Sequence, residues 1–72
     1  MLTIEQVQAK IETSCCVSVR NAKNTAFFDL GCDEIDDKGQ VEMYLKGSSE
    51  ARFVHWTFLA ADNVTFYKLQ EN

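Results

Sequence analysis

The sequence predicts an α+β fold in which one N-terminal helix packs on a five-stranded antiparallel sheet. Two observations lead to this prediction. Apolar residues recur at helical spacing only near the start of the chain, and from residue 15 onward they alternate with polar residues, as in strands with one buried face. Short turn-forming segments separate the alternating stretches, which favours neighbouring strands that run in opposite directions.

The predicted helix spans residues 4–13. Thr3 and Gln6 have the spacing of a capping box, in which each side chain hydrogen-bonds to the backbone N–H of the other residue. Val7 and Ile11 lie one turn apart on the same side of this helix, and the residues between them are mostly polar. This narrow apolar stripe suits a helix that lies on a sheet and leaves its other sides in water.

Five alternating segments predict strands at residues 15–20, 25–32, 41–46, 51–59 and 64–69. Gly39 is expected to take a positive φ in the loop before the third strand. All 72 residues are expected to form one domain, residues 1–72. The side chains predicted to face the helix are Val17, Val19, Phe28, Leu30, Val41, Met43, Leu45, Val54, Trp56, Phe58, Val64 and Phe66.

The segment 51–59 is the most informative strand prediction, because it holds the only Trp and the only His of the chain. Its β-branched and aromatic residues favour a pleated surface. Strict alternation places Val54, Trp56 and Phe58 toward the core and directs Phe53, His55, Thr57 and Leu59 to the opposite face.

A helix followed by an antiparallel meander that wraps it resembles the cystatin-like architecture in outline. The resemblance covers topology alone, since no family motif is matched, and it implies nothing about activity. The alternative is a small closed β-barrel in which the first and last strands pair and the helix plugs one end. The sequence leaves the order of the strands open.

Composition argues against several classes of partner. The formal net charge is −4, and the seven Lys and Arg residues are scattered, so we expect no direct contact with nucleic acid. No apolar run is long enough to span a membrane, and the first residues lack the pattern of a signal peptide. We therefore expect no membrane partner. Three cysteines do not make a disulfide framework, which indicates a cytoplasmic protein.

No catalytic motif is present, so the sequence predicts a protein that is not an enzyme and that needs no cofactor. Cys15, Cys16, Cys32 and His55 have poor spacing for zinc, and no metal is expected. Cys15 and Cys32 are interpreted as small buried residues and Cys16 as a partly exposed thiol. A nucleophilic pair of Cys16 and His55 is disfavoured because two strands would separate them.

An acidic loop between the second and third strands is a secondary candidate for binding. It contains Asp33, Glu34, Asp36 and Asp37. Read as a calcium loop, this segment places Lys38 and Leu45 at positions that require oxygen ligands. It is interpreted as a solvated hairpin loop, with a patch for a basic partner as the alternative.

The main candidate site is the sheet face that points away from the helix, where aromatic residues are expected to cluster in contact with water. Exposed aromatic patches are typical of interfaces. The sequence therefore predicts a small acidic, non-catalytic interaction module, of the inhibitor or adaptor type or self-associating as a homodimer, that binds another protein or itself. The alternative is a small-molecule-binding protein with a pocket on this face. The predicted binding residues are Phe27, Asp29, Tyr44, Phe53, His55, Thr57 and Tyr67.

Overall fold

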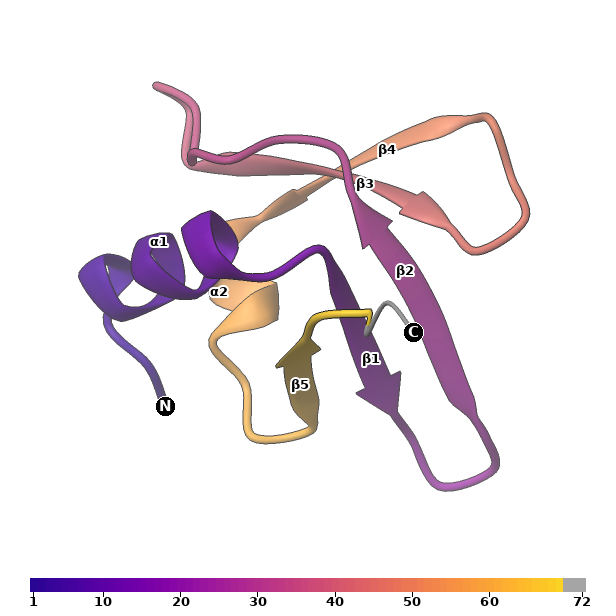
Figure 1. Cartoon of the computed structure of the whole chain (residues 1–72). Coiled ribbons are helices and arrows are strands. Elements are labelled where there is room, and N and C mark those ends of the chain that lie inside the picture. The colour runs from indigo at the N-terminus through magenta and orange to yellow at the C-terminus, as the bar shows by residue number, and fades with distance from the viewer. Residues whose placement is uncertain (70–72) are drawn as a thin grey trace.

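The predicted class is confirmed by a computed structural model, which describes residues 1–69. A single N-terminal helix packs on a five-stranded antiparallel sheet (Figure 1). Along the chain the elements are α1 (Ile4–Thr13), β1 (Cys16–Arg20), β2 (Thr25–Leu30), β3 (Gln40–Leu45), β4 (Ala51–His55), α2 (Trp56–Leu59) and β5 (Val64–Tyr67). No helix within the described residues is long and apolar enough to cross a membrane.

The strands lie in the order β4-β3-β2-β1-β5, so the first four form a meander and the last returns to the far edge. β5 pairs with β1, with Val17 opposite Phe66. Asn63 fixes the start of this pairing, because its carbonyl accepts from the Arg20 N–H and its side chain donates to the Arg20 carbonyl. The barrel alternative correctly pairs the first and last strands. It fails because β4 and β5 remain free edges and the sheet does not close.

The core lies between the sheet and the two helices, which occupy the same side of the strands in Figure 1. α1 contributes Val7 and Ile11, both almost fully buried, as its apolar stripe predicts. The other buried members of this cluster are Val17, Val41, Met43, Leu59 and Ala60. Fully burying side chains of this size contributes about 1.5–3 kcal/mol each, so these few residues account for much of the folding free energy.

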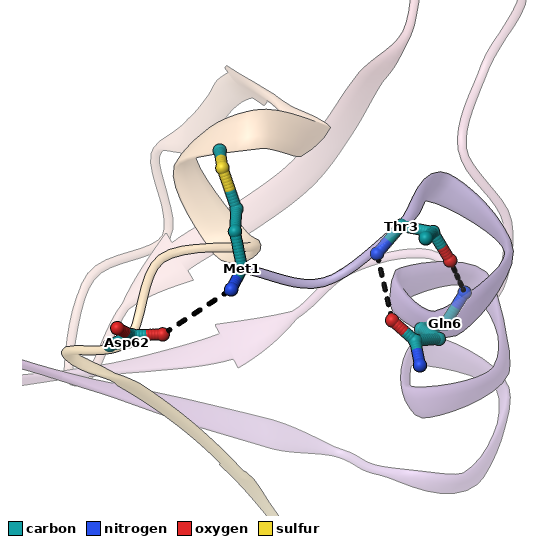
Figure 2. Close-up of polar contacts among 4 residues, drawn as sticks. All are labelled: Met1, Thr3, Gln6 and Asp62. Atoms are coloured by element: carbon teal, nitrogen blue, oxygen red, sulfur yellow. Dashed lines mark hydrogen bonds and ion pairs between the residues drawn. The ribbon is translucent and has the colours of Figure 1, made fainter.

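The capping box at the start of α1 forms as predicted (Figure 2). The Thr3 hydroxyl accepts from the Gln6 N–H at 3.2 Å, and the Gln6 side chain accepts from the Thr3 N–H at 2.8 Å. The amino group of Met1 lies 3.7 Å from a carboxylate oxygen of Asp62, and both groups are exposed. An exposed ion pair of this kind contributes little to stability. The Leu2 N–H donates to the Ala60 carbonyl and holds this segment against the end of α2.

Replacing Thr3 by Ala removes one half of this box. We expect the free energy of unfolding to fall by about 1 kcal/mol, the usual loss for a Thr cap. Urea denaturation with an unchanged slope and a lower midpoint would show this result. Thr13→Ala is the control at the other end of α1, where the hydroxyl donates to the Ala9 carbonyl and caps no free N–H. Equal losses for the two variants would contradict the capping role.

The predicted strand 51–59 is wrong in its second half. β4 ends at His55, and the next four residues form the single turn α2. His55 caps this turn, because its Nδ1 accepts from the Thr57 N–H. Trp56, Leu59 and Ala60 follow helical spacing, and they pack against the core from one side.

The change from strand to helix corrects the assignment of faces after Trp56. Val54 and Trp56 face the core as predicted. Phe58, predicted to be buried, is 45% exposed, and Leu59, predicted to face outward, is fully buried. A helical turn advances its side chains by about 100° per residue, so alternation stops at the residue where β4 ends.

Candidate functional site

One face of the sheet has no helix over it in the part of the chain that the structure describes. Both helices cover the side of Val17, Val41 and Val54, so the alternate residues of each strand form what we call the open face. Its members are Cys16, Ser18, Arg20, Thr25, Phe27, Asp29, Gln40, Glu42, Tyr44, Lys46, Ala51, Phe53, His55, Thr65 and Tyr67. Six of the seven predicted binding residues belong to it, all except Thr57.

The strand registers arrange the centre of the open face in a row across four strands. Tyr67 pairs with Cys16, Cys16 with Asp29, and Asp29 with Tyr44. Burial raises the pKa of Tyr67 above its ordinary value, and the nearby Cys16 and Asp29 add to this effect. Tyr44 and Tyr67 are both half-buried by their neighbours, which restricts the motion of their side chains.

Tyr44 is held flat against the sheet. Its ring lies over Gly31, where a Cβ atom would meet the ring at 2.6 Å, and its hydroxyl donates to the Glu42 carboxylate at 2.8 Å. This hydrogen bond raises the pKa of Tyr44, since the carboxylate favours the protonated phenol. Gly31 is thus the residue that permits an aromatic ring to lie here.

Phe27 and Phe53 are the exposed aromatic residues of the open face, with 47% and 57% of their surface in contact with solvent. Phe27 lies opposite Ser18 on β1, and Phe53 lies opposite Glu42 on β3. Beside Phe53 is an open hollow of about 240 Å³. Its other lining residues are Cys32, Glu34, Asp36, Gln40 and Glu42. This volume is below the roughly 300–1,000 Å³ that is typical of small-molecule sites, whereas a second open hollow on this face, beside Phe27, has about 410 Å³.

His55 lies at the end of β4, at the edge of the open face, and Thr57 follows it in α2. The His55 Nδ1 is 2.8 Å from the Thr57 hydroxyl, and the imidazole lies at a tilt beside the indole of Trp56. Their polar atoms therefore serve the cap of α2. Alternation misplaced Thr57, because it assumed that the strand continued past His55, where β4 ends.

The open face ends at a free strand edge. The Trp56 N–H donates to the Gly39 carbonyl, so these two residues form a hydrogen-bonded pair of the β3–β4 ladder. In an antiparallel ladder such pairs alternate with non-bonded pairs, and the residues of β4 at odd positions fall in the non-bonded pairs. Ala51, Phe53 and His55 therefore direct their backbone groups away from β3. Such an edge can pair with a strand of another molecule.

Acidic and basic residues occupy opposite ends of the open face. Asp29 and Glu42 lie toward the end of the sheet where β2 finishes, whereas Arg20 and Lys46 lie toward the end where β2 begins. A second copy that faces the first, related by a two-fold axis perpendicular to the strands, would place each acidic end against a basic end.

Comparison with protein-family models, with curated proteins and with solved structures finds no match for this chain. The site must therefore be interpreted from its own geometry.

The acidic loop is organised by hydrogen bonds within the protein. The Asp36 carboxylate accepts from the N–H groups of Lys38 and Gln40, and Gln8 of α1 bonds to the backbone of Asp33 and Ile35. Glu34 and Asp37 are exposed. Beside this loop α1 borders an open hollow of about 410 Å³. Within residues 1–69 no three His, Cys, Asp or Glu side chains gather as metal ligands do.

The burial predicted for the two adjacent cysteines is reversed. Cys15 is exposed and Cys16 is buried, although Cys16 does lie on the outward side of β1. β1 begins only at Cys16, so Cys15 precedes the alternating pattern, and the neighbours Asp29 and Tyr67 enclose Cys16. Cys32 is half-buried beside the core. Strands β2 and β3 separate Cys16 from His55.

Proposed function

We propose that this protein is a non-catalytic interaction module that binds a second copy of itself through the open face. The observation that carries the proposal is the pair Phe27 and Phe53, exposed on one side of a sheet whose other side holds the core. The divided charges favour a self-complementary contact, since the acidic end of one copy meets the basic end of the other. The free edge of β4 extends the same surface.

The expected affinity is modest. Five strands at about 4.8 Å and about five residues at 3.4 Å span roughly 400 Å² of flat sheet. Two such faces bury about 800 Å² in total, which is below the roughly 1,200–2,000 Å² of stable interfaces, so we expect a transient dimer with dissociation constants in the micromolar range or weaker. The net charge of −4 per copy also opposes association. Near physiological salt the repulsion reaches only about 8 Å, so local contacts decide the outcome.

The test is the double variant Phe27→Ser/Phe53→Ser, measured by sedimentation over a concentration series. We expect the dimer dissociation constant to rise about 30-fold, equivalent to about 2 kcal/mol, the size of a hot-spot loss. The matched control is Phe58→Ser, because Phe58 has similar exposure at 45% but belongs to α2 on the other side of the sheet. This control should leave the constant unchanged.

Two results would overturn the proposal. A parent protein that stays monomeric up to millimolar concentration does not bind itself. A double variant that keeps its circular dichroism spectrum and dimerises with the parent's constant would exclude the open face. The hollow between α1 and the acidic loop would then be the next surface to examine.

A further inference from the structure

Cys15 and Cys16 form an asymmetric pair of thiols at the start of β1, and the proposed interface does not use their chemistry. Their sulfur atoms are 3.2 Å apart. Cys15 is exposed, whereas only 1% of the surface of Cys16 is accessible. The two thiols therefore differ in access to dissolved reagents although they are neighbours in the chain.

The surroundings of Cys15 stabilise a thiolate. Its sulfur accepts from the Leu69 N–H at 3.3 Å and lies within hydrogen-bonding distance of the Cys16 thiol. These two donors lower the pKa of Cys15 below its ordinary value. Since the thiolate is the reactive form, a larger fraction of Cys15 is nucleophilic near neutral pH than in an ordinary exposed cysteine.

The surroundings of Cys16 keep it protonated. Its thiol lies 3.5 Å from a carboxylate oxygen of Asp29, which competes with the Cys15 sulfur for the single Cys16 proton. Burial, together with the negative charges of Cys15 and Asp29, raises the pKa of Cys16 to about 11. Cys16 is consequently a poor first nucleophile, but it is placed to react with whatever is attached to Cys15.

We propose that Cys15 and Cys16 are a thiol–disulfide exchange site for low-molecular-weight disulfides, with Cys15 as the attacking residue and Cys16 as the resolving residue. In the first step the Cys15 thiolate attacks one sulfur of the disulfide. The S–S bond of the reagent breaks, a mixed disulfide forms on Cys15, and the second sulfur leaves as a thiolate that takes a proton from water.

In the second step Cys16 gives its proton to the Asp29 carboxylate, 3.5 Å from its sulfur, and attacks the Sγ of Cys15. The mixed disulfide breaks, a bond between Cys15 and Cys16 forms, and the second thiolate of the reagent departs. The protein is oxidised by two electrons, and the reagent is reduced to two thiols. The short distance between the sulfur atoms favours this intramolecular attack over attack by a dissolved thiol.

The product is expected to be easily reduced. Consecutive Cα atoms are about 3.8 Å apart, whereas the Cα atoms of ordinary disulfides are about 4.4–6.8 Å apart. A bond between neighbours is therefore strained, and strained disulfides have more oxidising potentials. The pair should remain reduced in the presence of excess thiol and should oxidise only when disulfide accumulates.

The experiment treats the folded chain with glutathione disulfide and follows acid-quenched samples by intact mass and peptide mapping. The parent should lose two hydrogens and accumulate no adduct. Cys16→Ser, which keeps a donor but cannot resolve, should retain one glutathionyl group on Cys15. Cys15→Ser should leave Cys16 unmodified. Cys32→Ser is the control that keeps both members of the pair, and it should behave like the parent.

The pH dependence separates activation from simple exposure. The rate of the first step should rise with the thiolate fraction of Cys15 and reach its plateau at a lower pH than the rate of an unstructured cysteine peptide. At neutral pH Cys15 should react faster than the unstructured peptide. In Cys16→Ala, which lacks the thiol donor, the rise should move toward the pH of an ordinary thiol.

Three outcomes would overturn the proposal, and two of them need only the parent protein. The first is initial modification of Cys16 or Cys32. The second is a Cys15 adduct that accumulates in the parent to the same extent as in Cys16→Ser. The third is a disulfide between the neighbours that survives excess reduced glutathione, which would contradict the strain inferred from their spacing.

Discussion

Leu59→Ala should lower the free energy of unfolding by about 2–5 kcal/mol, whereas Phe58→Ala should change it by less than about 1 kcal/mol. Leu59 is fully buried against the core, and its truncation leaves a cavity that the surrounding side chains fill only in part. Phe58 is 45% exposed on the same turn of helix. For a domain of 72 residues the loss at Leu59 is a large share of the total stability.

This pair of variants distinguishes α2 from a continuous strand. A strand through residue 59 would bury Phe58 and expose Leu59, so the two losses would be exchanged. Thermal melts followed by circular dichroism measure both variants under the same conditions. A larger loss for Phe58→Ala than for Leu59→Ala would contradict the helical turn.

Gly39→Ala should lower the free energy of unfolding by about 2–3 kcal/mol, through two effects. Gly39 has a φ of +80°, a conformation that costs a residue with a Cβ about 1–2 kcal/mol. The added Cβ would also lie 2.9 Å from Nε2 of His55 and 3.3 Å from the indole of Trp56. Moving the imidazole would disturb the hydrogen bond by which it caps α2.

Gly47→Ala isolates the first effect. Gly47 has a φ of +88°, and a Cβ there would meet no atom within 4 Å. Denaturant midpoints should therefore show a smaller loss for Gly47→Ala than for Gly39→Ala. Equal losses would mean that His55 moves without cost, and that its contact with Gly39 does not support the end of β4.

Sequence-based prediction succeeded where the determining interactions are local. The capping box of Thr3 and Gln6 needs only residues three apart in the chain. Alternation correctly directed Val17, Val41 and Val54 to the core, because each lies inside a strand. The positive φ of Gly39 was predicted because glycine has no Cβ and adopts such angles readily in loops.

Sequence-based prediction failed where distant residues decide the conformation. Residues 51–59 fit both an alternating and a partly helical pattern, and the helical spacing of Trp56, Leu59 and Ala60 was a usable signal for α2. The pairing of β5 with β1 depends on contacts between residues more than forty positions apart, including Asn63 with Arg20. Tyr67 covers Cys16 only through that pairing, so the burial of Cys16 could not be predicted without it.

A dilution series of amide NMR spectra tests most directly the claim that this protein associates through its open face. The amide signals of Phe27, Tyr44 and Phe53 should shift together as the concentration rises, and a single dissociation constant should describe them. Those of α1 should stay fixed, because that helix lies on the covered side of the sheet. Shifts confined to α1 and the acidic loop, or no shifts at any concentration, would contradict the claim.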